Sequence, residues 1–112
     1  MIANSTLSDI IATYVKHGWI LRRVLLSQQL RIVIGDSLGK IFGDIMVVES
    51  DIDAAWFSRP PVEGGVPWEI RSLSDFPFAL LENIDENADR FEGRLNAVEA
   101  RLRENIAKRK SA

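Results

Sequence analysis

The chain has 112 residues, contains no cysteine and carries a formal net charge of -2. This length predicts a single domain, residues 1–112, that buries a core of its own. The lack of cysteine excludes a disulfide-stapled scaffold and a zinc–thiolate site, and it favours a cytoplasmic location. The weakly acidic balance argues against a nucleic-acid partner. We expect neither a signal peptide nor a membrane span, because no basic leader and no apolar run of about 20 residues is present.

A helix is predicted ahead of Gly18, and the segment "WILRRVLLS" after it predicts an interior strand rich in β-branched and aromatic residues. In a regular strand, Arg22 and Arg23 point to opposite faces. Because a charge inside an apolar strand is seldom buried without a partner, we expect a structural ion pair, for which the acidic segment "ESDID" is the candidate partner. An anion-binding arginine in a cleft is the alternative.

The stretch from Ser27 to Gly43 permits two interpretations. As a helix capped by Ser27, residues 28–42 keep a 3.6-residue apolar period as far as Phe42. As a strand, only "LRIVI" is regular and a loop follows. We favour the helix, in which three glycines spaced four residues apart, Gly35, Gly39 and Gly43, would form a strip that a neighbouring element can approach closely.

The segment "RIVIGDSL" within this stretch matches the nucleophile signature of a class of serine esterases. Ser37 would be the nucleophile, but that class places its histidine downstream in an Asp-x-x-His motif. The single histidine here is His17, which lies upstream, and no such motif follows. A phosphate-binding loop has four residues between its first glycine and its Gly-Lys pair, whereas three residues separate Gly35 from Gly39. The loop also has a serine or threonine after its lysine, whereas Ile41 follows Lys40 here. We therefore predict no catalytic residue here and no cofactor.

Four further strands are predicted from "DIMVVES", "IDAAWFSR", "PWEIRSL" and "FPFALLENI". The second and third should form a hairpin in which Trp56 faces Trp68 and Asp53 faces Arg71. The resulting fold is α+β: a mainly antiparallel sheet of about five strands, with an N-terminal helix, an inserted helix and a long C-terminal amphipathic helix. We expect the helices to lie on one face of the sheet.

The segment "ESDID" places Glu49, Asp51 and Asp53 at alternate positions, so that in an extended chain all three carboxylates point one way. Such a face could hold Mg²⁺ or Ca²⁺, which prefer oxygen ligands. An alternative function follows, a small metal-dependent hydrolase or nuclease. The favoured interpretation is a solvated turn between two strands, because aspartate is a common turn residue.

The final segment, residues 86–110, predicts a long amphipathic helix whose apolar residues form one stripe. The stripe consists of Phe91, Leu95, Val98, Leu102 and Ile106. At about 1.5 Å per residue such a helix exceeds ~30 Å and should overhang its own sheet. We expect the overhang to pack on a second chain, although packing on its own sheet stays open. The expected protein is thus a cytoplasmic, non-enzymatic interaction module acting as a homodimer, with an acidic chaperone or adaptor for a protein partner as a further alternative.

Overall fold

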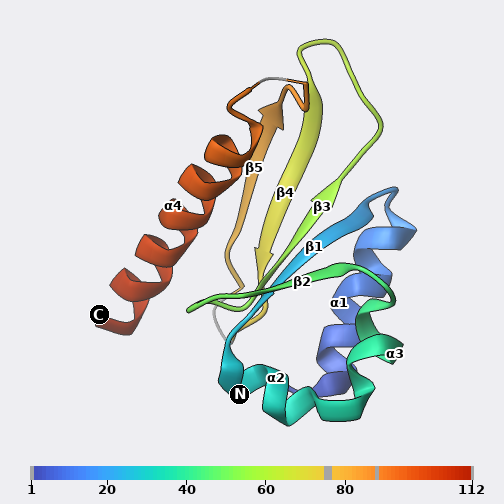
Figure 1. Ribbon diagram of the computed structural model, residues 1–112, viewed down its shortest axis with the longest axis vertical. Helices are drawn as coiled ribbons and strands as arrows, with labels where there is room; N and C mark the ends of the chain where they lie inside the picture. The colour runs from blue at the N-terminus through green and yellow to red at the C-terminus, as the bar shows by residue number, and fades with distance from the viewer. Residues whose placement is uncertain (1, 75–76, 88, 112) are drawn as a thin grey trace.

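The computed structural model describes residues 2–74, 77–87 and 89–111. The elements in chain order are α1 (Asn4–Lys16), β1 (Ile20–Leu26), α2 (Gln28–Ile34), a 3-10 turn (Gly35–Ser37), α3 (Leu38–Phe42), β2 (Met46–Glu49), β3 (Ala54–Ser58), β4 (Val66–Ser72), β5 (Ala79–Ile84) and α4 (Phe91–Ser111). Within the described residues the strands form one five-stranded sheet in the order β2-β1-β3-β4-β5. β1 and β2 are parallel, and the other neighbours are antiparallel (Figure 1). The predicted α+β fold is confirmed, although Phe76, with which the last predicted strand begins, lies outside the described residues.

The helices cover both faces of the sheet, so the prediction that they share one face is wrong (Figure 1). α4 packs on the face that carries Trp56 and Ile70, whereas α1, α2 and α3 pack on the face that carries Val24 and Phe57. The reason lies in β3, the central strand, all five residues of which are buried. A strand with large apolar side chains on both faces needs cover on both.

The inserted segment is helical, as favoured, but the helix is interrupted. α2 begins after Ser27, whose side-chain oxygen accepts a hydrogen bond from the backbone N–H of Leu30 at 3.2 Å. The 3-10 turn then separates α2 from α3. This segment connects two parallel strands, β1 and β2, which cannot be joined by a tight turn and need a crossover of this kind.

Two glycines of the inserted segment, Gly35 and Gly43, end helices, whereas Gly39 lies within α3. Gly35 and Gly43 follow α2 and α3 with φ of +54° and +68°, values at which glycine is favoured over other residues. At Gly35, Gly39 and Gly43 no packing neighbour lies within 4 Å of the place where a Cβ would stand. The predicted close-approach strip is therefore wrong.

β3 and β4 form the predicted antiparallel hairpin, but in a register shifted by two residues. Trp56 lies opposite Ile70, and Trp68 lies opposite Ser58. The two tryptophans do share the face under α4, and their rings contact edge to face with centroids 5.9 Å apart. Aromatic side chains reach diagonal neighbours across a strand pair, so burial on one face does not require direct opposition.

The C-terminal helix begins at Phe91, later than the predicted start at Glu86. The Asp85 carboxylate accepts a hydrogen bond from the backbone N–H of Asn87 at 2.9 Å. This bond closes a turn at the position where the sequence predicts the first turn of the helix. Glu86 extends toward the sheet and lies 3.8 Å from the Arg22 guanidinium. These contacts hold residues 85–87 in a turn ahead of the helix.

The apolar stripe of α4 packs on the chain's own sheet. Its members either belong to the core on this face or pack against it: Phe91, Leu95, Val98, Leu102 and Ile106. Within the described residues no part of the stripe overhangs the sheet, so the reason for expecting a dimer through it is removed. Among the same residues no helix combines the length and the apolar character needed to cross a bilayer.

Candidate interaction surface

Arg22 and Arg23 lie on the same face of the sheet, so their predicted opposite placement is wrong. A register irregularity between Leu21 and Arg23 adds one residue to β1 relative to β3. Such a bulge turns an additional side chain to the same side. Arg22 donates to Ser58 Oγ at 3.0 Å, and its guanidinium lies 5.0 Å from the centroid of the Trp68 ring, on the face that α4 covers.

The ion pair expected of one of these arginines is present, but its partner is not in "ESDID". Arg23 Nη1 and Nη2 donate to the two carboxylate oxygens of Glu92 at 3.0 and 2.9 Å. This hydrogen-bonded pair raises the pKa of Arg23 and lowers that of Glu92. Because Glu92 is in the first turn of α4, the pair ties that helix to β1. The alternative of an anion-binding arginine gains no support from these contacts.

The three acidic residues of "ESDID" do not form a common face, and Asp51 and Asp53 have different partners. Glu49 ends β2 and is exposed, while β3 begins only after Asp53, so the alternation of an extended chain does not hold across the turn. The Oδ1 and Oδ2 atoms of Asp51 accept hydrogen bonds from Arg103 Nε at 2.9 and 2.8 Å. The Asp53 carboxylate accepts hydrogen bonds from the backbone N–H of Ser27 at 2.6 Å and from the Ser27 hydroxyl at 3.2 Å. These bonds direct the Asp53 side chain to the start of α2 and away from β4.

The predicted cross-strand pair of Asp53 with Arg71 is therefore wrong, because Arg71 lies opposite Ala55. Asp53 instead secures the start of α2. The hydrogen bond from Arg103 holds the pKa of Asp51 below its ordinary value. Among the described residues, no group of three or more histidine, cysteine, aspartate or glutamate side chains is placed to hold a metal ion.

Adding Mg²⁺, Mn²⁺ or Ca²⁺ is expected to leave the melting temperature unchanged, because Asp51 and Asp53 are already bound by protein donors. An ion bound to the folded state would stabilise it by roughly 2.7 kcal/mol at about 100 times its dissociation constant. Thermal unfolding with and without each ion measures the effect. A rise of several degrees that Asp51→Asn abolishes would contradict this expectation.

One polar contact that sequence reasoning missed joins α1 to β4. The Tyr14 hydroxyl donates to the Glu69 carboxylate, and the Tyr14 ring stacks on Phe57 with centroids 4.1 Å apart. Burial, and then the contact with Glu69, raise the pKa of Tyr14 well above its ordinary value. The two residues are 55 positions apart, so no local pattern could reveal their contact. The one indication of this contact in the sequence is the charge of Glu69 within an otherwise apolar strand, because such a charge needs a polar partner.

The second missed feature is the edge strand β2, whose apolar side chains are exposed on the α4 face. Met46 is 59% exposed and Val48 is 37% exposed. In the β1 register Met46 lies beside Arg23 and Val48 beside Leu25. Arg23 binds α4 and Leu25 is buried beneath it, but among the described residues none from β2 belongs to that core. α4 therefore covers the sheet only as far as β1, and we call Met46 and Val48 the uncovered corner.

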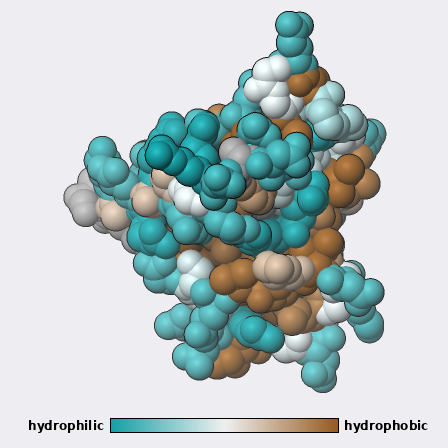
Figure 2. Space-filling model, turned by 45° about the horizontal axis from the view of Figure 1, so that its top comes forward, coloured by the Kyte–Doolittle hydropathy of each residue, from teal (hydrophilic) through white to brown (hydrophobic). Residues whose placement is uncertain are grey.

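Exposed apolar side chains also occur outside the uncovered corner. On α2, Ile32 is 73% exposed and Val33 is 56% exposed. Figure 2 shows hydrophobic side chains gathered in the lower half of that view, with hydrophilic side chains around them. Apolar surface that is gathered in this way and rimmed by polar groups is typical of interaction sites.

Among the residues that the structure describes, no strand pairs with the outer edge of β2. The N–H of Ser50 donates to the carbonyl of Leu26 on β1 at 3.0 Å. In a parallel pair alternate residues face the neighbouring strand, so Val47 and Glu49 direct their backbone groups outward. Lysine, proline and bulges commonly block such edges, and the sequence of β2, "MVVE", has neither lysine nor proline.

Comparisons with known proteins give no precedent for this surface. The chain matches no family model, and neither a curated protein nor a solved structure is similar to it.

Proposed function

We propose that this chain is a non-enzymatic interaction module of the cytoplasm that acts as a homodimer. The observation that carries the proposal is the uncovered corner, where Met46 and Val48 stand exposed beside a free strand edge. Removing apolar surface from water contributes about 25 cal/mol per Å², and a partner at this corner would gain that contribution. The absence of cysteine supports the cytoplasmic location.

The enzymatic alternative has less support than a binding role. A metal-dependent hydrolase would need Glu49, Asp51 and Asp53 to converge on one ion, whereas Asp51 is held by Arg103 and Asp53 by Ser27. The adaptor alternative keeps support from the exposed apolar residues of α2. An adaptor for another protein and a homodimer are compatible, because α2 and β2 are separate surfaces.

A nucleic-acid partner has less support than a protein partner, because three arginines of α4 already have carboxylate partners. Arg94 and Arg101 both lie within 3.5 Å of Glu82 on β5, at 3.0 and 3.5 Å. Arg103 binds Asp51. A phosphate would have to compete with these pairs, and binding to phosphates rests on available basic charge.

The double variant Met46→Lys with Val48→Lys is expected to be monomeric at concentrations where the intact chain is a dimer. Lysine on an edge strand opposes strand pairing, and at a twofold interface each introduced charge meets its counterpart. Leu81→Lys is the matched control, since Leu81 is 60% exposed on the opposite edge strand, β5. Light scattering gives the mass of each variant, and thermal unfolding confirms that all three proteins are folded.

A monomeric mass for the intact chain at tens of micromolar would contradict the homodimer. If the double lysine variant stayed dimeric, the interface would lie on another surface. The same would follow if Leu81→Lys disrupted the dimer equally.

A further inference from the structure

We propose that the outer edge of β2 binds a strand of another protein, an extended segment with an apolar centre and a basic residue toward each end. The bound segment adds one strand to the sheet. This inference goes beyond the proposed homodimer and does not depend on it. It uses the backbone edge of β2, whereas the dimer uses the side chains of the uncovered corner.

The backbone of β2 requires an extended partner. The N–H of Ser50 donates to β1, and alternate residues of a parallel pair face the neighbouring strand, so Val47 and Glu49 direct their N–H and C=O groups outward. No strand of the described residues pairs with these groups. A helix satisfies its own backbone groups and cannot bind here. An added strand can, because its main-chain hydrogen bonds supply affinity at an exposed sheet edge.

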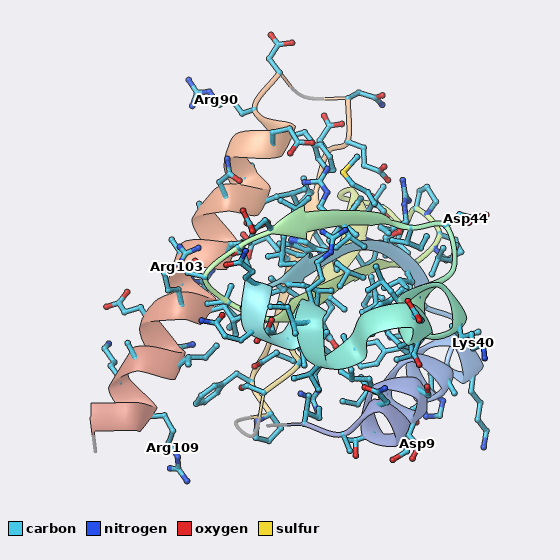
Figure 3. The ribbon with its side chains drawn as sticks, turned by 60° about the horizontal axis from the view of Figure 1, so that its bottom comes forward. Asp9, Lys40, Asp44, Arg90, Arg103 and Arg109 are labelled. Atoms are coloured by element: carbon cyan, nitrogen blue, oxygen red, sulfur yellow. The ribbon has the colours of Figure 1, made fainter. Side chains whose placement is uncertain are left out.

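The ends of β2 carry two negative charges that the fold does not neutralise. Asp44 precedes the strand, Glu49 ends it, and both are exposed. Among the described residues neither forms an ion pair, whereas Asp51 farther along is held by Arg103. Figure 3 shows Asp44 at one end of β2 and Arg103 at the other, while Lys40 lies apart from the strand. The edge therefore favours a strand that brings positive charge.

The same charges disfavour a second copy of β2 as the added strand. Antiparallel pairing centred on Val47 would place Asp44 of each copy beside Glu49 of the other. Like charges across a strand pair are destabilising, whereas opposite charges stabilise it. A strand with basic residues at these two positions forms two favourable pairs in place of two repulsive ones.

The positions of the basic residues follow from an antiparallel register, which is slightly more stable per residue than a parallel one. The central residue of the added strand lies opposite Val47 and exchanges both backbone hydrogen bonds with it. Its two neighbours point to the same face as Met46 and Val48 and extend that apolar surface. A basic residue two positions before the centre then lies opposite Glu49. One three positions after the centre lies opposite Asp44.

Titration of the intact chain with the peptide acetyl-Lys-Val-Thr-Val-Thr-Lys-amide tests the inference, with calorimetry as the measurement. The first threonine is the central residue of the register. An analogue with glutamine in place of both lysines is expected to bind about 2- to 30-fold more weakly, because two opposite-charge pairs are lost. An analogue with proline in place of the first threonine should not bind, because proline has no N–H to donate to the carbonyl of Val47.

Reversing the charges on the protein should reverse the preference. The double variant Asp44→Lys with Glu49→Lys is expected to bind an analogue with glutamate in place of both lysines more tightly than it binds the lysine peptide. Asp36→Lys with Glu104→Lys makes the same change in net charge at two exposed acids outside β2 and should keep the original preference. Thermal unfolding confirms that both double variants are folded.

Amide hydrogen exchange locates the bound peptide. The N–H groups of Val47 and Glu49 should exchange more slowly in the complex, while those of β5, the other edge strand, should not change. Slower exchange on β5 in place of β2, or binding of the proline analogue as tight as that of the lysine peptide, would overturn strand addition at this edge.

The remaining outcomes separate this inference from the proposed function. A dimeric chain that binds none of these peptides overturns the inference and leaves the homodimer standing. Equal affinity for the lysine and glutamate peptides overturns the charge complementarity on which the choice of partner depends. A monomeric chain that binds the lysine peptide selectively supports the inference and refutes the homodimer.

Discussion

Replacing Leu102 with alanine is expected to lower the free energy of unfolding by about 3–5 kcal/mol. Leu102 is fully buried in the core between α4 and the sheet, together with Trp56 and Ile70. The loss combines the transfer free energy of the removed atoms with that of the cavity left behind. Urea unfolding at fixed protein concentration measures it as a lower midpoint at an unchanged slope.

Two control variants test whether the loss of stability comes from the burial of Leu102. Glu104→Ala changes an exposed residue of the same helix, 3.4 Å from Lys108, and should cost no more than about 0.5 kcal/mol. Leu7→Ala removes a fully buried leucine from the core on the opposite face and should match Leu102→Ala in magnitude. A Leu102→Ala protein that keeps its stability but loses a subunit would show that the stripe is an interface, contrary to its burial on its own sheet.

The elements of this fold were predictable because their periods are local. The apolar stripe of α4 and the alternating segments of the strands each repeat within a few residues. The arrangement of the helices on the two faces of the sheet was harder to predict, although the sequence of β3 indicates it. Ala55 and Phe57 alternate with Trp56, so both faces of this strand are apolar, and that pattern requires cover on both sides. The predicted placement of all helices on one face is incompatible with that pattern.

The placement of Arg22 and Arg23 failed for a different reason. A single inserted residue reverses which face each following side chain occupies, and nothing in "LRRV" marks the bulge. It becomes visible only through contacts across the sheet, where Arg22 lies against Trp68. The pairing of β1 with β3 decides which face each of these side chains occupies, and the local sequence does not predict that pairing.

The candidate surface was missed because apolar character does not reveal strand order. "IMVV" has apolar side chains on both faces and resembles an interior strand, whereas β2 is at the edge of the sheet. Its position follows from the parallel crossover through α2 and α3, and from the limited reach of α4 across the sheet. Met46 and Val48 are thus exposed by topology, not by composition.

Tyr14 is expected to resist ionisation at alkaline pH, which is the other large effect. Free tyrosine titrates near pH 10, whereas burial of the Tyr14 hydroxyl and its bond to Glu69 raise its pKa in the folded chain. The chain contains one tyrosine, so tyrosinate absorbance reports this residue alone. We expect no tyrosinate signal near pH 10 from the folded protein and a normal titration in denaturant.

The sign of the linked effect on stability follows from the direction of the shift. A folded-state pKa above the unfolded value means that the fold favours the neutral hydroxyl. The resulting stabilisation is fully present below about pH 10 and is lost as the pH rises through the raised pKa of Tyr14. Tyr14→Phe should therefore remove this alkaline decline from a plot of unfolding free energy against pH.

The cause of the shift can be divided by two matched variants. Glu69→Gln removes the negative charge beside the hydroxyl and should lower the pKa of Tyr14 part of the way, because burial still disfavours the phenolate. Glu82→Gln removes a carboxylate on β5 that binds Arg94 and should leave the titration unchanged. If Tyr14 titrated near pH 10 while the protein stayed folded, α1 could not be packed against β4 through Glu69. The cover of that face of the sheet would then differ from the arrangement described above, because the same contact stacks Tyr14 on Phe57 in the central strand.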